Sequence, residues 1–118
     1  MILKSNGDYV ATHVEFACST YKQALGLMFR RNIPDDYALV FVMKKSTKVS
    51  LHMLFVNFPI GVIFLDENKK VVKLSELKPW IGLCSSDTKV KYVIETNKGI
   101  EKKADLHVGD VLSFKSKC

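Results

Sequence analysis

The side chains that could carry out chemistry in this chain are few, and each also has a structural interpretation. Arg30 follows an apolar segment, where a guanidinium can bind a carboxylate or another small anion through paired hydrogen bonds. Alternatively, Arg30 bonds helix carbonyls or pairs with Asp35 or Asp36. His52 lies within an apolar run, where it is either a hydrogen-bonded residue of the core or, if it faces a cavity, a ligand-binding group.

The only tryptophan, Trp80, belongs to an irregular segment at residues 75–88 that also contains Cys84. Long irregular segments in compact domains often bind ligands or cover the edge of a sheet. The indole can fill the core or form an aromatic platform at the mouth of a pocket, and we expect the first. Arg30, His52 and Trp80 are the predicted ligand-binding residues.

Common catalytic and metal-binding motifs are absent from the sequence. The three histidines, His13, His52 and His107, lack the spacing that brings imidazoles together on a zinc ion. The sequence also lacks a GxSxG elbow, a Walker loop, a GxGxxG turn and an HExxH helix. We therefore expect no catalysis, cofactor or metal. The alternative is a hydrolase-like enzyme that uses His52 as its base.

The cysteine pattern bears on the compartment. Cys18, Cys84 and Cys118 give an odd count without CxxC spacing, which predicts reduced thiols rather than a disulfide framework. Cys84 is the candidate reactive thiol, because Cys18 is expected to be buried and Cys118 to lie in a loose terminus. The first residues show no basic segment followed by a long apolar run, so no signal peptide is predicted. These observations predict a cytoplasmic protein.

Length and composition predict one soluble globular domain over residues 1–118, with 47% hydrophobic and 25% charged residues. The net charge of +6 comes from 18 basic residues, mostly lysines, against 12 acidic ones. Such a balance allows nucleic-acid binding through a lysine-rich surface. The alternative, which we favour, is a solvated surface, because no aromatic side chains are interleaved with the basic runs.

The most apolar stretch, Val49–Asp66, is expected to organise the fold. Pro59 and Gly61 interrupt it, which argues against a membrane-spanning helix and predicts no membrane partner. Its Val, Ile and Phe content instead predicts two strands, Val49–Val56 and Ile60–Leu65, in the middle of a sheet.

The remaining elements follow from turn residues and periodicity. An Asn-Gly turn predicts a hairpin at the N-terminus, and spacings of three and four predict a helix from Ser19 or Thr20 to about Arg30. The strand at residues 89–95 alternates and is expected to be half-buried, with Val93 and Glu95 on its polar face. The other expected elements are strands at residues 1–4, 9–15, 37–43, 70–74 and 111–115, and a short helix at 100–106.

This pattern predicts a mostly β protein with one main helix. We expect a compact antiparallel β-barrel or sandwich of about seven to nine short strands. The helix near residues 20–30 is expected to pack on one end of it.

Four ordered blocks resemble the family catalogued as domain of unknown function 192 (uncharacterised protein family 0127), in an archaeal-type form. They are Gly26–Arg30, the pattern from His52 to Asp66, Lys91–Glu95 and Val108–Val111. The chain differs from many relatives in having Gly61 where they carry Asp, and an apolar Leu54-Phe55-Val56 where many bacterial ones carry Lys-Asn-Thr. The resemblance implies a β-sandwich or barrel and no particular activity.

Together, these observations favour a small β-rich binding or accessory module without catalysis. The predicted partner is a small anionic ligand held near Arg30 and His52, in a pocket that is apolar apart from a few converging polar groups.

Overall fold

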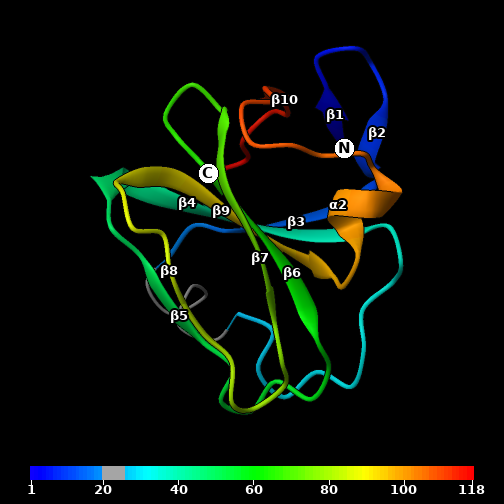
Figure 1. Cartoon of the computed structure of the whole chain (residues 1–118), viewed down its shortest axis with the longest axis vertical. Coiled ribbons are helices and arrows are strands. Elements are labelled where there is room, and N and C mark those ends of the chain that lie inside the picture. The colour runs from blue at the N-terminus through cyan, green and yellow to red at the C-terminus, as the bar shows by residue number, and fades with distance from the viewer. Residues whose placement is uncertain (20–25) are drawn as a thin grey trace.

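Strands dominate the computed structural model, which describes residues 1–19 and 26–118 (Figure 1). In this described part of the chain the elements are β1 (Ile2–Lys4), β2 (Tyr9–Ala11), β3 (His13–Ala17), β4 (Tyr37–Thr47), β5 (Ser50–His52), β6 (Ile60–Leu65), β7 (Val71–Leu77), β8 (Leu83–Ser85), β9 (Val90–Asn97), the short helix α2 (Ile100–Lys103) and β10 (Leu112–Ser113). The prediction of a mostly β protein is confirmed. Over these same residues, no helix is long and apolar enough to cross a membrane.

The strands of the described residues form three sheets. A central sheet has the order β3-β4-β9-β6-β7, a second has the order β10-β1-β2, and β5 pairs with β8. The sheets do not close into a barrel, so a sandwich-like arrangement is the observed one of the two predicted. Figure 1 shows β5 and β8 to the left of the central sheet and β1, β2 and α2 to its upper right.

One pairing departs from the antiparallel expectation, because β3 and β4 run parallel. The predicted hairpin forms between β1 and β2, but its second strand breaks at Thr12 and continues as β3 in the central sheet. The backbone N–H groups of Thr12 and His13 donate to the Asp36 carbonyl at 3.1 and 3.2 Å, and the Thr12 hydroxyl donates to the Asp36 carboxylate. These bonds attach the break to the start of β4 and set the parallel register.

The central sheet is covered on both faces. One apolar cluster contains Tyr37, Leu39 and Phe64 and is packed by residues such as Met53. The other contains Val40 and is packed by residues of β1, β10 and α2. Because β6 and β9 are interior strands, side chains on both of their faces are buried.

The first half of the Val49–Asp66 stretch was predicted wrongly. β6 spans Ile60–Leu65 in the middle of the central sheet, as expected, but β5 ends at His52 and pairs with β8 in a separate sheet. After His52 the chain turns, and the turn is closed by the Val56 N–H donating to the Met53 carbonyl at 3.0 Å. Apolar content alone indicated a strand because it does not distinguish a strand from a turn that carries apolar side chains, such as Leu54 and Phe55.

Two further predictions are corrected. The strand at residues 89–95 is not half-buried, because β9 lies between β4 and β6 and both its faces are covered. The helix predicted from Ser19 or Thr20 to Arg30 falls largely on residues 20–25, which lie outside the described residues. Its expected C-terminal part, Gly26–Phe29, forms turns instead.

The prediction of reduced thiols is wrong for two of the three cysteines. Cys18 and Cys118 form a disulfide with their Cα atoms 5.5 Å apart, and Cys84 remains free. β10 pairs with β1, and the chain after it runs back beside β3, which places Cys118 next to the residue that follows β3. A sequence separation of 100 residues leaves no local spacing that could have indicated this bond.

Replacing Gly61 by alanine is expected to destabilise the fold by about 1–3 kcal/mol. A Cβ at Gly61 would lie 2.9 Å from the Thr96 side-chain oxygen and 3.0 Å from a methyl carbon of Ile100. Urea denaturation of Gly61→Ala measures the loss. Glu76→Ala, at the exposed position that pairs with Gly61 on β7, is the control and should change little. An unchanged denaturation midpoint in Gly61→Ala would show that these neighbours give way without cost.

Candidate functional site

Arg30 is held by two side chains from the start of the central sheet. Its Nη1 donates to the Tyr37 hydroxyl at 2.9 Å and lies 3.4 Å from the Glu15 carboxylate. The guanidinium carbon also lies 5.4 Å from the centre of the Tyr37 ring. The expected alternatives, helix carbonyls or Asp35 and Asp36, are not its partners in the described residues. With 35% of its side chain exposed, Arg30 is fixed in place and still accessible to a ligand.

The charges around Arg30 keep it cationic. Burial lowers the pKa of Arg30, but Tyr37 and Glu15 raise it, and the net result is a value above the ordinary one. Burial raises the pKa of Tyr37 to about 12, so its hydroxyl stays protonated and accepts from the guanidinium as a neutral group. Glu15 is about half exposed, and an ion pair of this kind contributes little to stability.

Glu95 was not identified from the sequence as a candidate residue. It lies on β9 between Leu39 of β4 and Val62 of β6, with 7% of its surface exposed. Burial raises its pKa to about 7, although the positive charge of Arg30 acts in the opposite direction. A carboxyl that titrates near neutral pH beside a cation is typical of functional sites.

The sequence carried a partial signal for the importance of Arg30 and Glu95. Arg30 and Glu95 each end one of the blocks on which the family resemblance rests, Gly26–Arg30 and Lys91–Glu95. The alternation of β9 nevertheless placed Glu95 on the polar face with Lys91, because it did not show that an apolar cluster covers that face of the sheet. The place of β9 in the central sheet puts Glu95 where the positive charge of Arg30 acts on it. Periodicity along β9 does not show this.

Three exposed aromatic side chains, Phe29, Phe55 and Trp80, form a group that we call the aromatic rim. The ring centres of Phe29 and Phe55 are 5.0 Å apart, and those of Phe55 and Trp80 are 5.1 Å apart. Their exposed fractions are 66%, 42% and 46% respectively. The expectation that Trp80 fills the core is therefore wrong, and its role as an aromatic platform at the mouth of a pocket stays a prediction.

The backbone of the aromatic rim is unusual. Phe29, Phe55 and Trp80 all have positive φ angles, of 66°, 63° and 67°. Bulky residues rarely adopt this left-handed conformation, and such strain concentrates at functional sites. Backbone bonds hold the three loops together: the Phe29 N–H donates to the Phe55 carbonyl at 2.8 Å, and the Trp80 N–H donates to the Met53 carbonyl at 3.1 Å.

Asn57 connects the aromatic rim to Arg30. Its side-chain oxygen accepts from the Trp80 indole N–H at 3.0 Å, and its amide nitrogen donates to the Arg30 carbonyl at 3.4 Å. The loops that carry these residues meet at the lower end of the molecule in Figure 1. Two of the three predicted site residues, Arg30 and Trp80, are thus brought together.

His52 is placed differently from its prediction. It lies at the exposed end of β5 rather than in mid-strand, paired with Leu83 of β8. Its Nδ1 accepts from the Leu54 N–H at 3.3 Å, and this bond does not involve Nε2. In the described residues, no interaction links His52 with Arg30. Its interpretation as a core residue is wrong, and its role in ligand binding stays a prediction.

The arrangement offers contacts for a small organic ligand. Among residues 1–19 and 26–118, no three His, Cys, Asp or Glu side chains converge as a metal site would require. The site combines the partly exposed guanidinium of Arg30 with the aromatic rim, whose first member, Phe29, is the preceding residue. Such a combination can hold an anionic group and an apolar body of the same molecule.

Comparison with known proteins is consistent with this fold. Residues 1–114 match the family model DUF192, described as Uncharacterized ACR, COG1430. The chain is 38% identical over 116 residues to UPF0127 protein PF1050 of Pyrococcus furiosus, covering 97% of each chain.

Two solved structures share the architecture. A protein of unknown function from Novosphingobium aromaticivorans matches with a TM-score of 0.85 and 22% identity, over 96% of this chain and 81% of that one. A putative transcription regulator from Sinorhizobium meliloti matches with a TM-score of 0.80 and 24% identity, over 95% and 88%. At these identities the likeness concerns the fold alone.

Proposed function

The chain belongs to the DUF192 family, and from the geometry of its own residues we propose that it is a binding module, without catalysis, for a small ligand that joins an anionic group to an aromatic or apolar body. The observation that carries the proposal is the aromatic rim next to the partly exposed Arg30. Asn57 bonds the Trp80 indole and the Arg30 backbone carbonyl, while Tyr37 and Glu15 hold the guanidinium. Membership of the family supplies the fold, and the site supplies the ligand chemistry.

Arg30 can provide the anion contact. Only its Nη1 is engaged by side chains in the described part of the chain, so other N–H donors of the guanidinium are available. Glu15 is a weak competitor, because it is about half exposed and 3.4 Å away. Glu95 adds a second negative charge that interacts with Arg30 when it is ionised, and its pKa of about 7 makes that charge depend on pH. Anion affinity should therefore rise as the pH falls from 8 to 6.

The aromatic rim can provide the apolar contact. Exposed aromatic clusters on a protein surface mark binding sites more often than single exposed side chains do. The left-handed backbone of Phe29, Phe55 and Trp80 costs stability, and a binding role explains why the chain presents large side chains there.

Phenylacetate is expected to bind and to change the fluorescence of Trp80, the only tryptophan. Acetate, which lacks the ring, and benzyl alcohol, which lacks the charge, should bind more weakly. Arg30→Gln should weaken phenylacetate binding roughly tenfold to hundredfold, because a charge-assisted hydrogen bond contributes about 1.5–3 kcal/mol. Phe55→Ala should weaken it roughly three- to tenfold while leaving the fluorophore in place.

Arg31→Gln is the matched control, since Arg31 is the neighbouring exposed arginine. It removes the same charge without touching the site, and we expect its affinity to equal that of the unmodified chain. Equal losses in Arg30→Gln and Arg31→Gln would reduce the effect to general surface charge. Absence of phenylacetate binding at millimolar concentration would overturn the proposed ligand class.

A further inference from the structure

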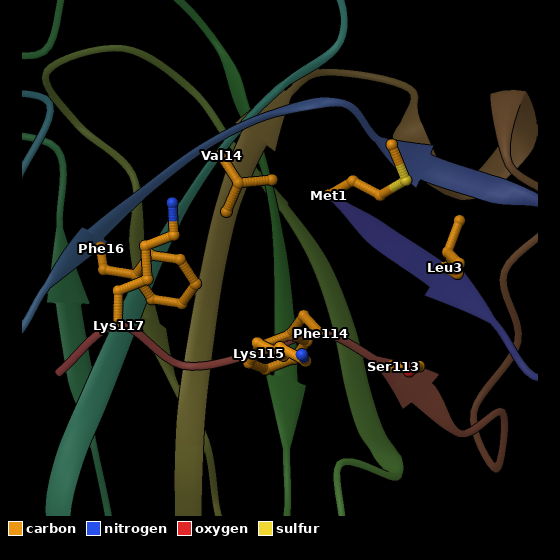
Figure 2. A pocket seen from close by; sticks show the side chains of 8 residues that line it. All are labelled: Met1, Leu3, Val14, Phe16, Ser113, Phe114, Lys115 and Lys117. Atoms are coloured by element: carbon orange, nitrogen blue, oxygen red, sulfur yellow. The ribbon is translucent and has the colours of Figure 1, made fainter.

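A groove of about 450 Å³ lies on the other face of the central sheet from Arg30 (Figure 2). Figure 2 shows β3 along one side of it, the C-terminal segment after β10 along the other, and β1 at one end. Glu15 and Phe16 are neighbours on β3 and point to opposite faces, so Glu15 contacts Arg30 while Phe16 lines the groove. The two sites are therefore independent.

The walls of the groove are apolar. Leu3, Val14 and Phe16 contribute side chains from β1 and β3, and Phe114 contributes its ring from the C-terminal segment. Phe114 is buried, with its ring centre 6.3 Å from that of Phe16 and 5.3 Å from that of Tyr92. The Phe114 ring is packed against the core, so it forms a fixed apolar floor for the groove.

The edge of the groove carries positive charge. Lys115 and Lys117 both line it, and no acidic side chain does so among the described residues. Figure 2 shows the Lys117 side chain beside Phe16. Lys69 lies behind the floor, where its Nζ donates to the Phe114 carbonyl at 2.6 Å and lies 4.4 Å from the Phe114 ring centre. The charged side chains that line the groove or lie behind its floor are thus all positive.

The segment that carries both lysines is attached at each end. Ser113 pairs with Leu3 of β1, and Cys118 is bonded to Cys18. Residues 114–117 therefore form a short strap beside β3 whose backbone is held at both ends. Preorganisation of this kind increases affinity because less conformational freedom is lost.

We infer that this groove binds a single-chain amphiphile with an anionic head group, and that a medium-chain fatty carboxylate is its ligand class. The alkyl chain lies against Val14, Phe16 and Phe114, and the carboxylate faces Lys115 and Lys117. The volume falls within the range of small-molecule pockets. Charge complementarity selects an anionic head over a neutral or cationic one.

Calorimetric titration of the full chain with hexanoate, octanoate and decanoate, each below its micelle concentration, tests the inference. Affinity should rise roughly two- to fourfold per added methylene, as expected for burial of the chain. Octanol and octylamine should bind more weakly than octanoate. The double variant Lys115→Gln with Lys117→Gln should weaken octanoate binding roughly two- to fivefold for each lysine removed.

Lys98→Gln is the matched control, because Lys98 is an exposed lysine outside the groove. It should leave octanoate affinity unchanged. Val14→Trp fills the groove and should abolish binding; if that variant does not fold, the lysine variants decide the question. No octanoate binding, equal binding of octylamine, or equal losses in Lys98→Gln and the double variant would each overturn the inference. Any octanoate bound at Arg30 should be lost in Arg30→Gln, whereas the binding that the double lysine variant weakens should remain in it, which separates this site from the first.

Discussion

Removing the Cys18–Cys118 disulfide is expected to lower the free energy of unfolding by about 2–4 kcal/mol. The bond joins residues separated by 100 positions, so it closes most of the chain into a loop in the unfolded state. Closing a loop of that length removes conformational entropy from the unfolded chain, which raises its free energy relative to the folded state. The variant Cys118→Ser and a reducing agent should have the same effect.

Urea denaturation with and without dithiothreitol measures this loss. The reduced protein should unfold at lower urea, and its m-value should rise, because an uncrosslinked chain exposes more surface. Cys84→Ser keeps the disulfide and should still respond to the reductant, whereas Cys118→Ser should not. A response of Cys118→Ser equal to that of the unmodified chain would show that the reductant acts elsewhere.

The disulfide also bears on the cellular compartment of the protein. The sequence predicted a cytoplasmic protein partly because its cysteines resembled reduced thiols. Disulfides persist mainly in oxidising compartments, with intracellular proteins of hyperthermophiles as an exception. With Cys18 and Cys118 bonded, the cysteine pattern no longer supports a reducing compartment. The cytoplasmic location stays a prediction.

The parts of the fold that could be predicted are those specified locally. β4 and β6 followed from apolar runs of β-branched and aromatic residues. The turn before β7 is also specified locally, because the Asp66 side chain accepts from the Asn68 and Lys70 N–H groups at 2.9 and 3.0 Å. Each of these signals involves residues a few positions apart, so periodicity and turn chemistry detect them.

The parts that could not be predicted depend on strand order. Glu95 reads as an exposed member of an alternating strand until its face of the central sheet is known to be covered by an apolar cluster. Arg30 and Trp80 were identified from their side-chain chemistry, but the loop geometry that joins them through Asn57 depends on left-handed residues that have no sequence signature when they are not glycine. Their partners were therefore missed, and Trp80 was assigned to the core.

Glu95→Gln is expected to stabilise the protein at pH 8 by about 3 kcal/mol and to leave its stability at pH 4 nearly unchanged. The pKa of Glu95 is about 7 in the folded protein, against an ordinary value of 4.5. Below pH 4.5 the carboxyl is protonated in both states and has no effect. As the pH rises toward 7, the unfolded chain releases the proton before the folded one does, so stability falls. Above about pH 7 the loss, about 3 kcal/mol, is complete.

Urea denaturation of both proteins from pH 4 to pH 8 measures the effect as a difference. Groups that titrate alike in the two proteins cancel, so the difference reports Glu95. Glutamine keeps the shape of the side chain and has no charge to desolvate, which is why its stability should lack this pH dependence. Glu76→Gln, at an exposed position on β7, should give a flat difference. A flat or opposite difference for Glu95→Gln would contradict the raised pKa.

Arg30 connects this titration to the proposed binding site. Its positive charge lowers the pKa of Glu95, so removing the charge in Arg30→Gln should move the pH-dependent loss of stability to higher pH. Conversely, a bound anion that neutralises Arg30 should shift the titration in the same direction. If phenylacetate binds at Arg30, proton uptake by Glu95 should accompany binding near pH 7, and calorimetry in buffers of different ionisation enthalpy would detect it. Glu95→Gln should bind phenylacetate without that uptake, because its amide cannot take up a proton.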